Sequence, residues 1–93
     1  MPEFRKRPDT QRYEILESGE VIGHITYEKK AEGIFDLTHT EIDPGKSGNG
    51  LGGLLVGFAL DDIRTQGARA IPTCTFIEKY MDEHPAVADL RAR

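Results

Sequence analysis

GKSGNGLGGLLVGFAL, residues 45–60, holds six of the ten glycines of this chain and joins them to an almost unbroken apolar run. Glycine adopts positive φ angles and lets a ligand approach the backbone without a Cβ in the way. A helix that begins in such a loop presents unpaired N–H groups and the positive end of its dipole. The stretch therefore predicts a receptor for a phosphate or diphosphate group at the start of a helix.

Apolar residues recur at helical spacing from Leu51 onward, which predicts a helix with a wide apolar face. Charged residues occur only near its end, and Gly67 supplies a C-terminal stop. A helix that is apolar over so much of its circumference must lie across a sheet. Glycine inside a helix costs about 1 kcal/mol relative to alanine, so Gly57 predicts a close contact at that point.

Three short segments rich in β-forming residues precede the loop. They are Arg12–Leu16, Val21–Glu28 and Ile34–Ile42, and turn-forming residues separate them. The short connections predict three consecutive antiparallel strands. Alternation along the third segment predicts two faces, one of which carries Phe35, Leu37, His39 and Glu41, and the other Ile34, Asp36, Thr38, Thr40 and Ile42.

The segment after the helix predicts a fourth strand and further helix. Ala70–Thr75 is the strand, and its Pro72 confines it to an edge or an irregular position. Phe76–Asp82 is expected to form a short helix, and Ala86–Ala92 a final turn or two. The order β-β-β-α-β-α predicts an α+β (mixed α/β) fold, with one layer of sheet and helices against it.

Size and composition indicate one ordinary globular domain over residues 1–93, with residues 1–11 as a tail that is loose or ordered only by pairing. The formal charge of −4 argues against broad binding of nucleic acid or anionic membranes, because those partners reward a basic surface. No apolar run approaches the length of a membrane span, and no signal peptide is recognisable. A single cysteine, Cys74, excludes an internal disulfide, so a cytoplasmic protein is expected.

Several phosphate-binding templates compete for the glycine cluster. Residues 45–47 imitate the end of a Walker A loop, but that motif places its first glycine at Thr40. Residues 48–53 satisfy G-x-G-x-x-G, yet the dinucleotide fold needs parallel strands that alternate with helices. A third template fits the context: an antiparallel meander, then x-Gly-x-Gly-x-Gly, then a buried helix. The alternative to a phosphate-binding loop is a glycine-rich turn that binds no ligand and only connects the strand to the helix.

The third template resembles the acetyl-coenzyme-A-binding segment of the GNAT acetyltransferase superfamily, and in particular its small single-domain members. Those proteins carry His-Thr and an acidic residue before the loop, and then Pro-x-Cys-x-Phe, an aromatic residue and His-Pro. This chain carries the same features in the same order over about residues 12–90, as Thr38-His39-Thr40-Glu41, Gly48-Asn49-Gly50-Leu51-Gly52, Pro72-Thr73-Cys74-Thr75-Phe76, Tyr80 and His84-Pro85. It departs at Ser47, where the superfamily usually has arginine or glutamine, although Lys46 supplies a charge beside it.

The resemblance implies that acetyl-coenzyme A is the co-substrate. No metal is expected, because His24 and His84 have too few Cys, Asp or His partners at ligand spacing. The residues implied in coenzyme binding are Lys46, Ser47, Gly48, Asn49, Gly50, Leu51, Gly52 and Gly53. The resemblance also implies that Cys74 and His39 face the acetyl thioester. Either Cys74 accepts the acetyl group as a nucleophile, or His39 deprotonates an incoming amine as a general base. Tyr80 resembles the superfamily tyrosine that protonates the departing thiolate, but its spacing is short, and packing is its simpler role.

The implied function is transfer of an acetyl group from acetyl-coenzyme A to an amine acceptor, which is the activity of an N-acetyltransferase. The alternative is a module that binds coenzyme A or senses acyl-coenzyme A with little catalysis. Little of the 93-residue chain is left to build a deep acceptor pocket. A protein partner or a second copy of the chain is therefore one way in which that pocket is completed.

Overall fold

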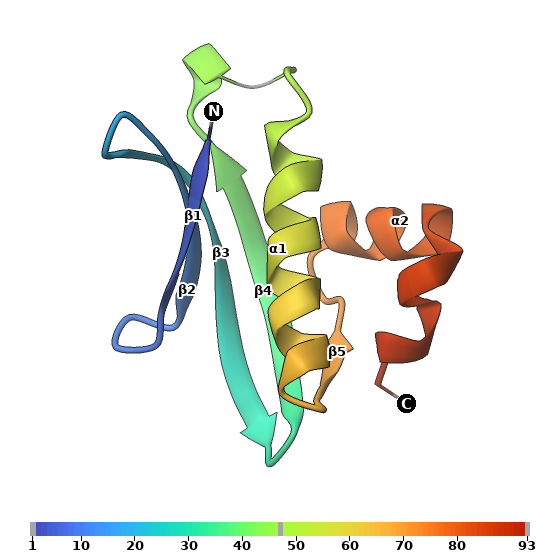
Figure 1. The fold of residues 1–93 in the computed structure, drawn as a ribbon. Coiled ribbons are helices and arrows are strands. Elements are labelled where there is room, and N and C mark those ends of the chain that lie inside the picture. Colours follow the sequence, from blue (N-terminus) through green and yellow to red (C-terminus); the bar gives the residue numbers. More distant parts are fainter. Residues whose placement is uncertain (1, 47, 93) are drawn as a thin grey trace.

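A computed structural model describes residues 2–46 and 48–92, and within these residues one five-stranded sheet organises the fold (Figure 1). The strands lie in chain order across the sheet: β1 (Glu3–Arg7), β2 (Arg12–Glu17), β3 (Glu20–Ala31), β4 (Ile34–Ile42) and β5 (Arg69–Ile71). The first four pair in antiparallel fashion, whereas β5 runs parallel to β4. A parallel pair needs a crossover connection, and the buried helix supplies it.

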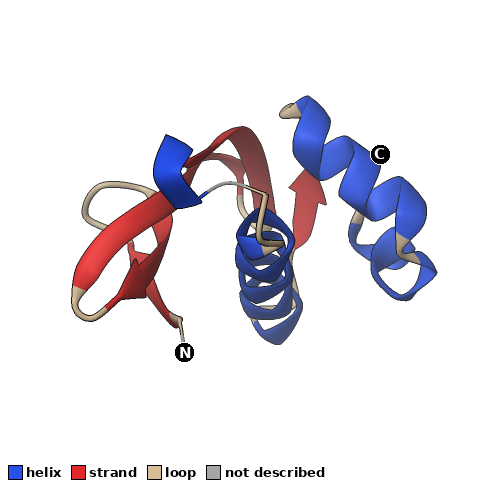
Figure 2. Ribbon diagram, turned by 90° about the horizontal axis from the view of Figure 1, so that it is seen from above, coloured by secondary structure: helices blue, strands red, loops and turns tan. Residues whose placement is uncertain are grey.

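Helix α1 (Leu51–Thr65) is this crossover and lies along one face of the sheet (Figure 1). The second helix, α2 (Thr75–Glu83), and the 3-10 helix η2 (Pro85–Leu90) lie beyond β5, at the end of the sheet opposite β1. Figure 2 looks down α1 and shows the sheet curving beside it. A short 3-10 helix, η1 (Pro44–Lys46), leads out of β4 toward the glycine loop. The α+β class is therefore confirmed.

The core fills the space between the sheet and α1. Apolar side chains of the helix at its predicted spacing meet apolar and aromatic side chains that alternate along the strands. The buried residues of α1 are Leu51, Leu55, Val56, Ala59, Leu60 and Ile63. Their partners on the sheet include Tyr13, Ile15, Ile25, Tyr27, Phe35 and Leu37.

The predicted meander, glycine loop and buried helix are present, and β4 has the predicted ends. The predicted strand Ala70–Thr75 is wrong at its C-terminal half, because β5 ends at Ile71 and Pro72 has no N–H for the ladder. Cys74 is instead the N-cap residue of α2. The N-terminal tail, which the sequence left open, is ordered by pairing, since Glu3–Arg7 pairs with β2.

A β-bulge in β4 overturns the strict alternation predicted for this strand. Thr26 pairs with His39 and Tyr27 pairs with Leu37, so Thr38 is an extra residue without a place in the register. Leu37 is fully buried in the core, whereas His39 is exposed. The prediction that Leu37 and His39 share one face is therefore wrong. The bulge turns His39 away from α1 and Thr40 toward it.

A polar cluster ties α1 to the edge of the sheet. Tyr13 donates a hydrogen bond to Asp62 Oδ2 at 2.7 Å, and Lys6 Nζ lies 2.9 Å from the same oxygen. Burial alone would raise the pKa of Asp62, but the hydrogen bonds from Tyr13 and Lys6 outweigh it and lower that pKa. A carboxylate with a lowered pKa stabilises the fold above its unfolded pKa of about 3.9, and this stabilisation is lost as the pH falls through the folded pKa.

Tyr13→Phe is therefore expected to lower the free energy of unfolding by about 1 kcal/mol near neutral pH, because it removes one hydrogen bond to Asp62. The difference from the wild type should shrink below pH 4, since protonated Asp62 gains little from the tyrosine. Urea unfolding at pH 7 and pH 3 measures both effects. An equal difference at the two pH values would show that the cluster does not carry this pH dependence.

Candidate functional site

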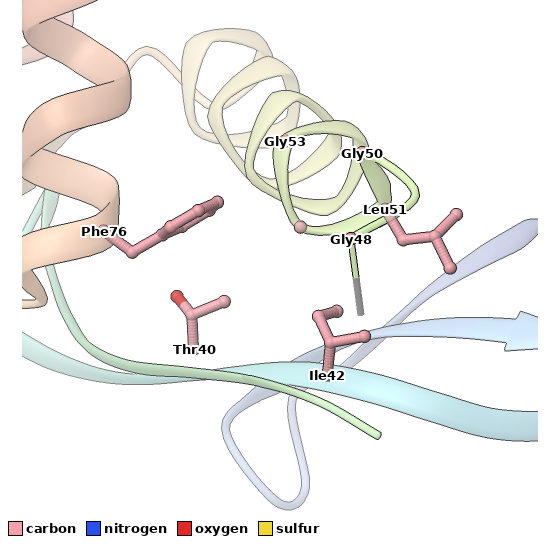
Figure 3. A pocket seen from close by; sticks show the side chains of 8 residues that line it. Thr40, Ile42, Gly48, Gly50, Leu51, Gly53 and Phe76 are labelled. Carbon is pink, nitrogen blue, oxygen red and sulfur yellow. The ribbon is translucent and has the colours of Figure 1, made fainter. Parts of the chain in front are cut away.

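A pocket of about 380 Å³ opens between the end of β4, the start of α1 and the side chain of Phe76 on α2 (Figure 3). Figure 3 shows Thr40 and Ile42 rising from the strand toward the first turn of α1. The lining residues are Thr40, Ile42, Gly48, Gly50, Leu51, Gly52, Gly53 and Phe76. Five of these belong to the loop and helix start that the sequence marked for coenzyme binding.

The loop backbone exposes the N-terminal end of α1 to this pocket. Gly48 and Gly50 have φ angles of 87° and 74°, which lie in the left-handed region that favours glycine. Gly50 is the N-cap residue, and no described side chain caps it. Leu54 N–H donates to Gly50 O at 3.2 Å, so the N–H groups of residues 51–53 have no acceptor inside the helix. The first turn, described in full, holds no acidic side chain, and its positive end suits an anion.

The walls of the pocket are mainly apolar, which restricts the ligand further. Ile42, Leu51 and Phe76 contribute apolar side chains to the lining, and Phe76 is 46% exposed. A Cβ built at Gly52 would lie 2.9 Å from the Phe76 ring atom Cζ. Any larger residue at position 52 would therefore displace the Phe76 ring. An anion-binding end beside an apolar cleft suits an amphipathic ligand with a phosphate group.

Lys46 and Asn49, which were also predicted to bind the coenzyme, do not line the pocket but form contacts in the loop beside it. Lys46 Nζ lies 3.1 Å from Glu17 Oε1 in an exposed ion pair. Asn49 Nδ2 donates to the carbonyl oxygen of Lys46 at 3.2 Å. Ser47, the third such residue, lies outside the described residues. The pocket therefore offers an anion mainly backbone N–H groups, because the charge of Lys46 is shared with Glu17.

Cys74 lies beside the pocket, at the start of α2. Its N–H donates to Leu37 O at 2.9 Å. Leu37 is the residue of β4 that follows Asp36, the last one paired with β5. Its side chain is partly buried, and Sγ donates to Thr40 Oγ1 at 3.4 Å. The structure thus places the sole cysteine against a residue that lines the pocket.

His39 lies next to Thr40 in the sequence but on the opposite face of β4. Its side chain is 61% exposed, and Nε2 lies 3.4 Å from Glu41 Oε1. The His39 ring is 6.3 Å from the ring of His24, and His24 Nε2 accepts a hydrogen bond from Arg12 Nη2 at 3.1 Å. Burial, together with the nearby Arg12 charge, lowers the pKa of His24. The structure therefore brings Cys74 to Thr40, and it places His39 in a polar row on the face turned away from α1.

Thr40 is the site residue that sequence reasoning missed. Strict alternation already placed it opposite His39, but the resemblance directed attention to the histidine. The bulge at Thr38 is the reason that Thr40, rather than His39, shares a face with Leu37. The only signal in the sequence was its place between His39 and Glu41.

Tyr80 packs the two helices together. Its hydroxyl would lie 3.3 Å from a Cβ at Gly57, which confirms the close contact predicted for that glycine. Its ring stacks on His84 with centroids 3.8 Å apart. These contacts support the packing role that the sequence favoured for Tyr80.

The described residues offer no group of three or more His, Cys, Asp or Glu side chains arranged to hold a metal ion. Among the helices of residues 2–46 and 48–92, none is both long and apolar enough to cross a membrane.

Comparison with solved structures supports the fold. A GCN5-like protein from Staphylococcus aureus matches 97% of this chain and 87% of its own with a TM-score of 0.75 at 18% identity, a likeness that shows the fold. A GNAT family acetyltransferase from Brucella melitensis, solved in complex with acetyl-CoA, is 32% identical with a TM-score of 0.53. That match covers 62% of this chain and 41% of the Brucella protein.

Comparison with known sequences gives relatives of greater length. Protein NATD1 of Gallus gallus is 36% identical over 61 residues, which cover 66% of this chain and 56% of that protein. The NATD1 protein of Homo sapiens is also 36% identical, with 54% of its length covered. The match thus spans little more than half of these relatives. The family model described as GCN5-related N-acetyl-transferase matches residues 12–90. The chain therefore belongs to the GCN5-related N-acetyltransferase family.

Proposed function

We propose that this protein transfers an acetyl group from acetyl-coenzyme A to an amine. The observation that carries the proposal is the start of α1, which no described side chain caps and which opens into an apolar pocket beside Cys74. Unpaired N–H groups of residues 51–53 would bind the diphosphate of the coenzyme. The apolar walls formed by Ile42 and Phe76 would contact its pantetheine arm. Family membership and the acetyl-CoA complex of the Brucella relative support acetyl transfer.

The covalent route uses Cys74 as the nucleophile. Its sulfur attacks the thioester carbon, the bond from that carbon to the coenzyme sulfur breaks, and the proton lost by Cys74 ends on the coenzyme thiolate. The acceptor amine then attacks acetyl-cysteine, and the proton it releases restores the thiol. This route needs a sulfur at the edge of the coenzyme pocket, and the contact between Cys74 and Thr40 supplies that position.

The direct route uses His39 as a general base. The imidazole would accept a proton from the amine while the amine nitrogen attacks the thioester. His39 lies on the face of β4 turned away from α1 and from the pocket. An acceptor that uses this base must therefore approach from that face, past Glu41, whose carboxylate suits a cationic amine.

Mass spectrometry of the intact protein after incubation with acetyl-coenzyme A tests the covalent route. The wild type is expected to gain one acetyl group, Cys74→Ala none, and His39→Ala the same as the wild type. The single cysteine makes the assignment unambiguous. Cys74→Ala removes only the sulfur and leaves Thr40 in its place in the strand ladder. Its affinity for coenzyme A should therefore stay near that of the wild type, and measuring this affinity is the control.

If the wild-type protein gains no acetyl group, two hypotheses remain: direct transfer and a module that binds or senses acyl-coenzyme A. Turnover of amine acceptors without the adduct would favour direct transfer, and loss of that turnover in His39→Ala would identify the base. Coenzyme binding without adduct and without turnover would favour the module that binds or senses acyl-coenzyme A. The position of His39 favours this second candidate, because the general-base candidate lies on the face of β4 turned away from the pocket.

A further inference from the structure

Thr40 connects the pocket with the thiol of Cys74. Its side chain lines the pocket, and its Oγ1 accepts the hydrogen bond from Cys74 Sγ at 3.4 Å. Figure 3 shows this side chain pointing from β4 into the space below the first turn of α1, opposite Phe76. The contact therefore holds the sulfur against a side chain that lines the pocket, although Cys74 itself does not line it.

The backbone around Cys74 is fixed by bonds on both sides. The N–H of Cys74 donates to Leu37 O at 2.9 Å, and its carbonyl oxygen accepts from Glu78 N–H at 2.9 Å. Just before it, the Thr73 hydroxyl donates to the buried carboxylate of Asp36 at 2.5 Å. With the backbone held in this way, the remaining freedom is rotation about χ1, which has three staggered positions. The bond to Thr40 selects one of them.

We infer that Thr40 is a positioning residue for acetyl transfer, and that its hydroxyl holds the Cys74 sulfur toward the bound thioester. The inference rests on the proposed covalent route. A threonine hydroxyl accepts a hydrogen bond and also donates one. It therefore holds the thiol as an acceptor, and it turns to donate to the sulfur once the proton has left.

The bulge at Thr38 gives this arrangement its geometry. Alternate residues of a strand face opposite sides of the sheet. The extra residue leaves Thr40 on the same side as the buried Leu37, and His39 on the other side. The His-Thr pair therefore contributes its threonine to the thiol side of the sheet.

Two substitutions at one position test the inference. Thr40→Val keeps the shape of the side chain but removes the hydroxyl, whereas Thr40→Ser keeps the hydroxyl. Thr65→Val is the control, because Thr65 is the exposed last residue of α1 and does not line the pocket. For each variant three quantities are measured: the affinity for acetyl-coenzyme A, the single-turnover rate of Cys74 acetylation, and the rate of alkylation by iodoacetamide.

Thr40→Val is expected to slow acetylation by roughly five- to tenfold, because one hydrogen bond and one rotamer preference are lost. Its affinity for acetyl-coenzyme A should stay within about twofold of the wild type, and Thr40→Ser should restore the rate. Alkylation should change less than acetylation, because a small reagent reaches the sulfur in any rotamer. Thr65→Val should acetylate at the wild-type rate.

Three results would overturn the inference. Acetylation of Thr40→Val at the wild-type rate, beside a normal wild-type adduct, would leave the covalent route standing without a role for Thr40. An equal fall in acetylation and alkylation would mean that Thr40 alters the reactivity of the thiol rather than its placement. A wild type that binds acetyl-coenzyme A without forming the adduct would remove the covalent route, and the inference with it.

Discussion

Replacing Gly50 with valine is expected to weaken binding of coenzyme A by at least about a hundredfold. Gly50 caps α1 with a φ of 74°, a conformation that costs a β-branched residue roughly 1–2 kcal/mol. A valine that escapes this strain turns the N–H groups of residues 51–53 away from the diphosphate. Two lost charge-assisted hydrogen bonds of about 1.5–3 kcal/mol each account for a change of this size.

Gly67→Val is the matched control for this prediction. Gly67 ends α1 with a φ of 68°, and a Cβ at either glycine would meet no atom within 4 Å. Both variants therefore pay a similar conformational cost in folding, but Gly67 lies at the other end of the helix from the pocket. Isothermal titration with coenzyme A should show weakened binding for Gly50→Val and near-normal binding for Gly67→Val. Equal losses in the two variants would mean that the effect is one of stability.

Replacing Ile42 with aspartate is expected to have the second-largest effect. Ile42 lines the pocket at the end of β4, opposite the first turn of α1. A carboxylate there would repel the diphosphate across a partly desolvated space, where two like charges interact more strongly than in bulk water. Asparagine has nearly the shape of aspartate, so Ile42→Asn loses the same apolar contact without gaining a charge. The difference in coenzyme affinity between the two variants therefore isolates the effect of the charge.

Ile42→Asp should bind coenzyme A roughly ten- to a hundredfold more weakly than Ile42→Asn at low ionic strength. The gap should narrow as salt is added, because ions screen the repulsion. Titrations at roughly 20 mM and roughly 500 mM salt would measure this difference in affinity. The screening length falls severalfold over that range. Equal affinities of the aspartate and asparagine variants at low salt would place the diphosphate away from this pocket.

Local signals in the sequence were enough for the parts of the fold that depend on neighbours in the chain. β4 has its predicted ends at Ile34 and Ile42, because a turn precedes it and the glycine loop follows. α1 begins at Leu51, which lies within the glycine cluster and is the first residue of the helical apolar spacing. The contact at Gly57 was also predictable, because a glycine in a buried helix needs a reason of this kind.

Features that depend on pairing between distant segments were not predictable. The bulge at Thr38 arises from the register of β4 on β3, and the sequence of β4 alone gives no sign of it. The same holds for the ion pair of Lys46 with Glu17, which joins residues that are far apart in the chain. The short β5 follows from the separation of β4 and β5 after Asp36, whereas the sequence suggested a longer strand.

The candidate site shows the same division. It was predictable that Gly48, Gly50 and Gly52 would line a pocket, because a loop that offers its backbone to a ligand needs positions without side chains. The relation between Cys74 and His39 was not, because it depends on which face of the sheet each residue occupies. The structure gives Cys74 a contact with Thr40 instead.

Titration calorimetry of the wild-type chain with coenzyme A, 3′-dephospho-coenzyme A and pantetheine tests the central claim most directly. Coenzyme A and its dephospho form both carry the diphosphate, whereas pantetheine has the same thiol arm without it. If the N–H groups at the start of α1 bind the diphosphate, coenzyme A and its dephospho form should bind with similar affinity. Pantetheine should then bind at least about a hundredfold more weakly. Binding of pantetheine as tight as that of coenzyme A, or no binding of coenzyme A, would contradict the account.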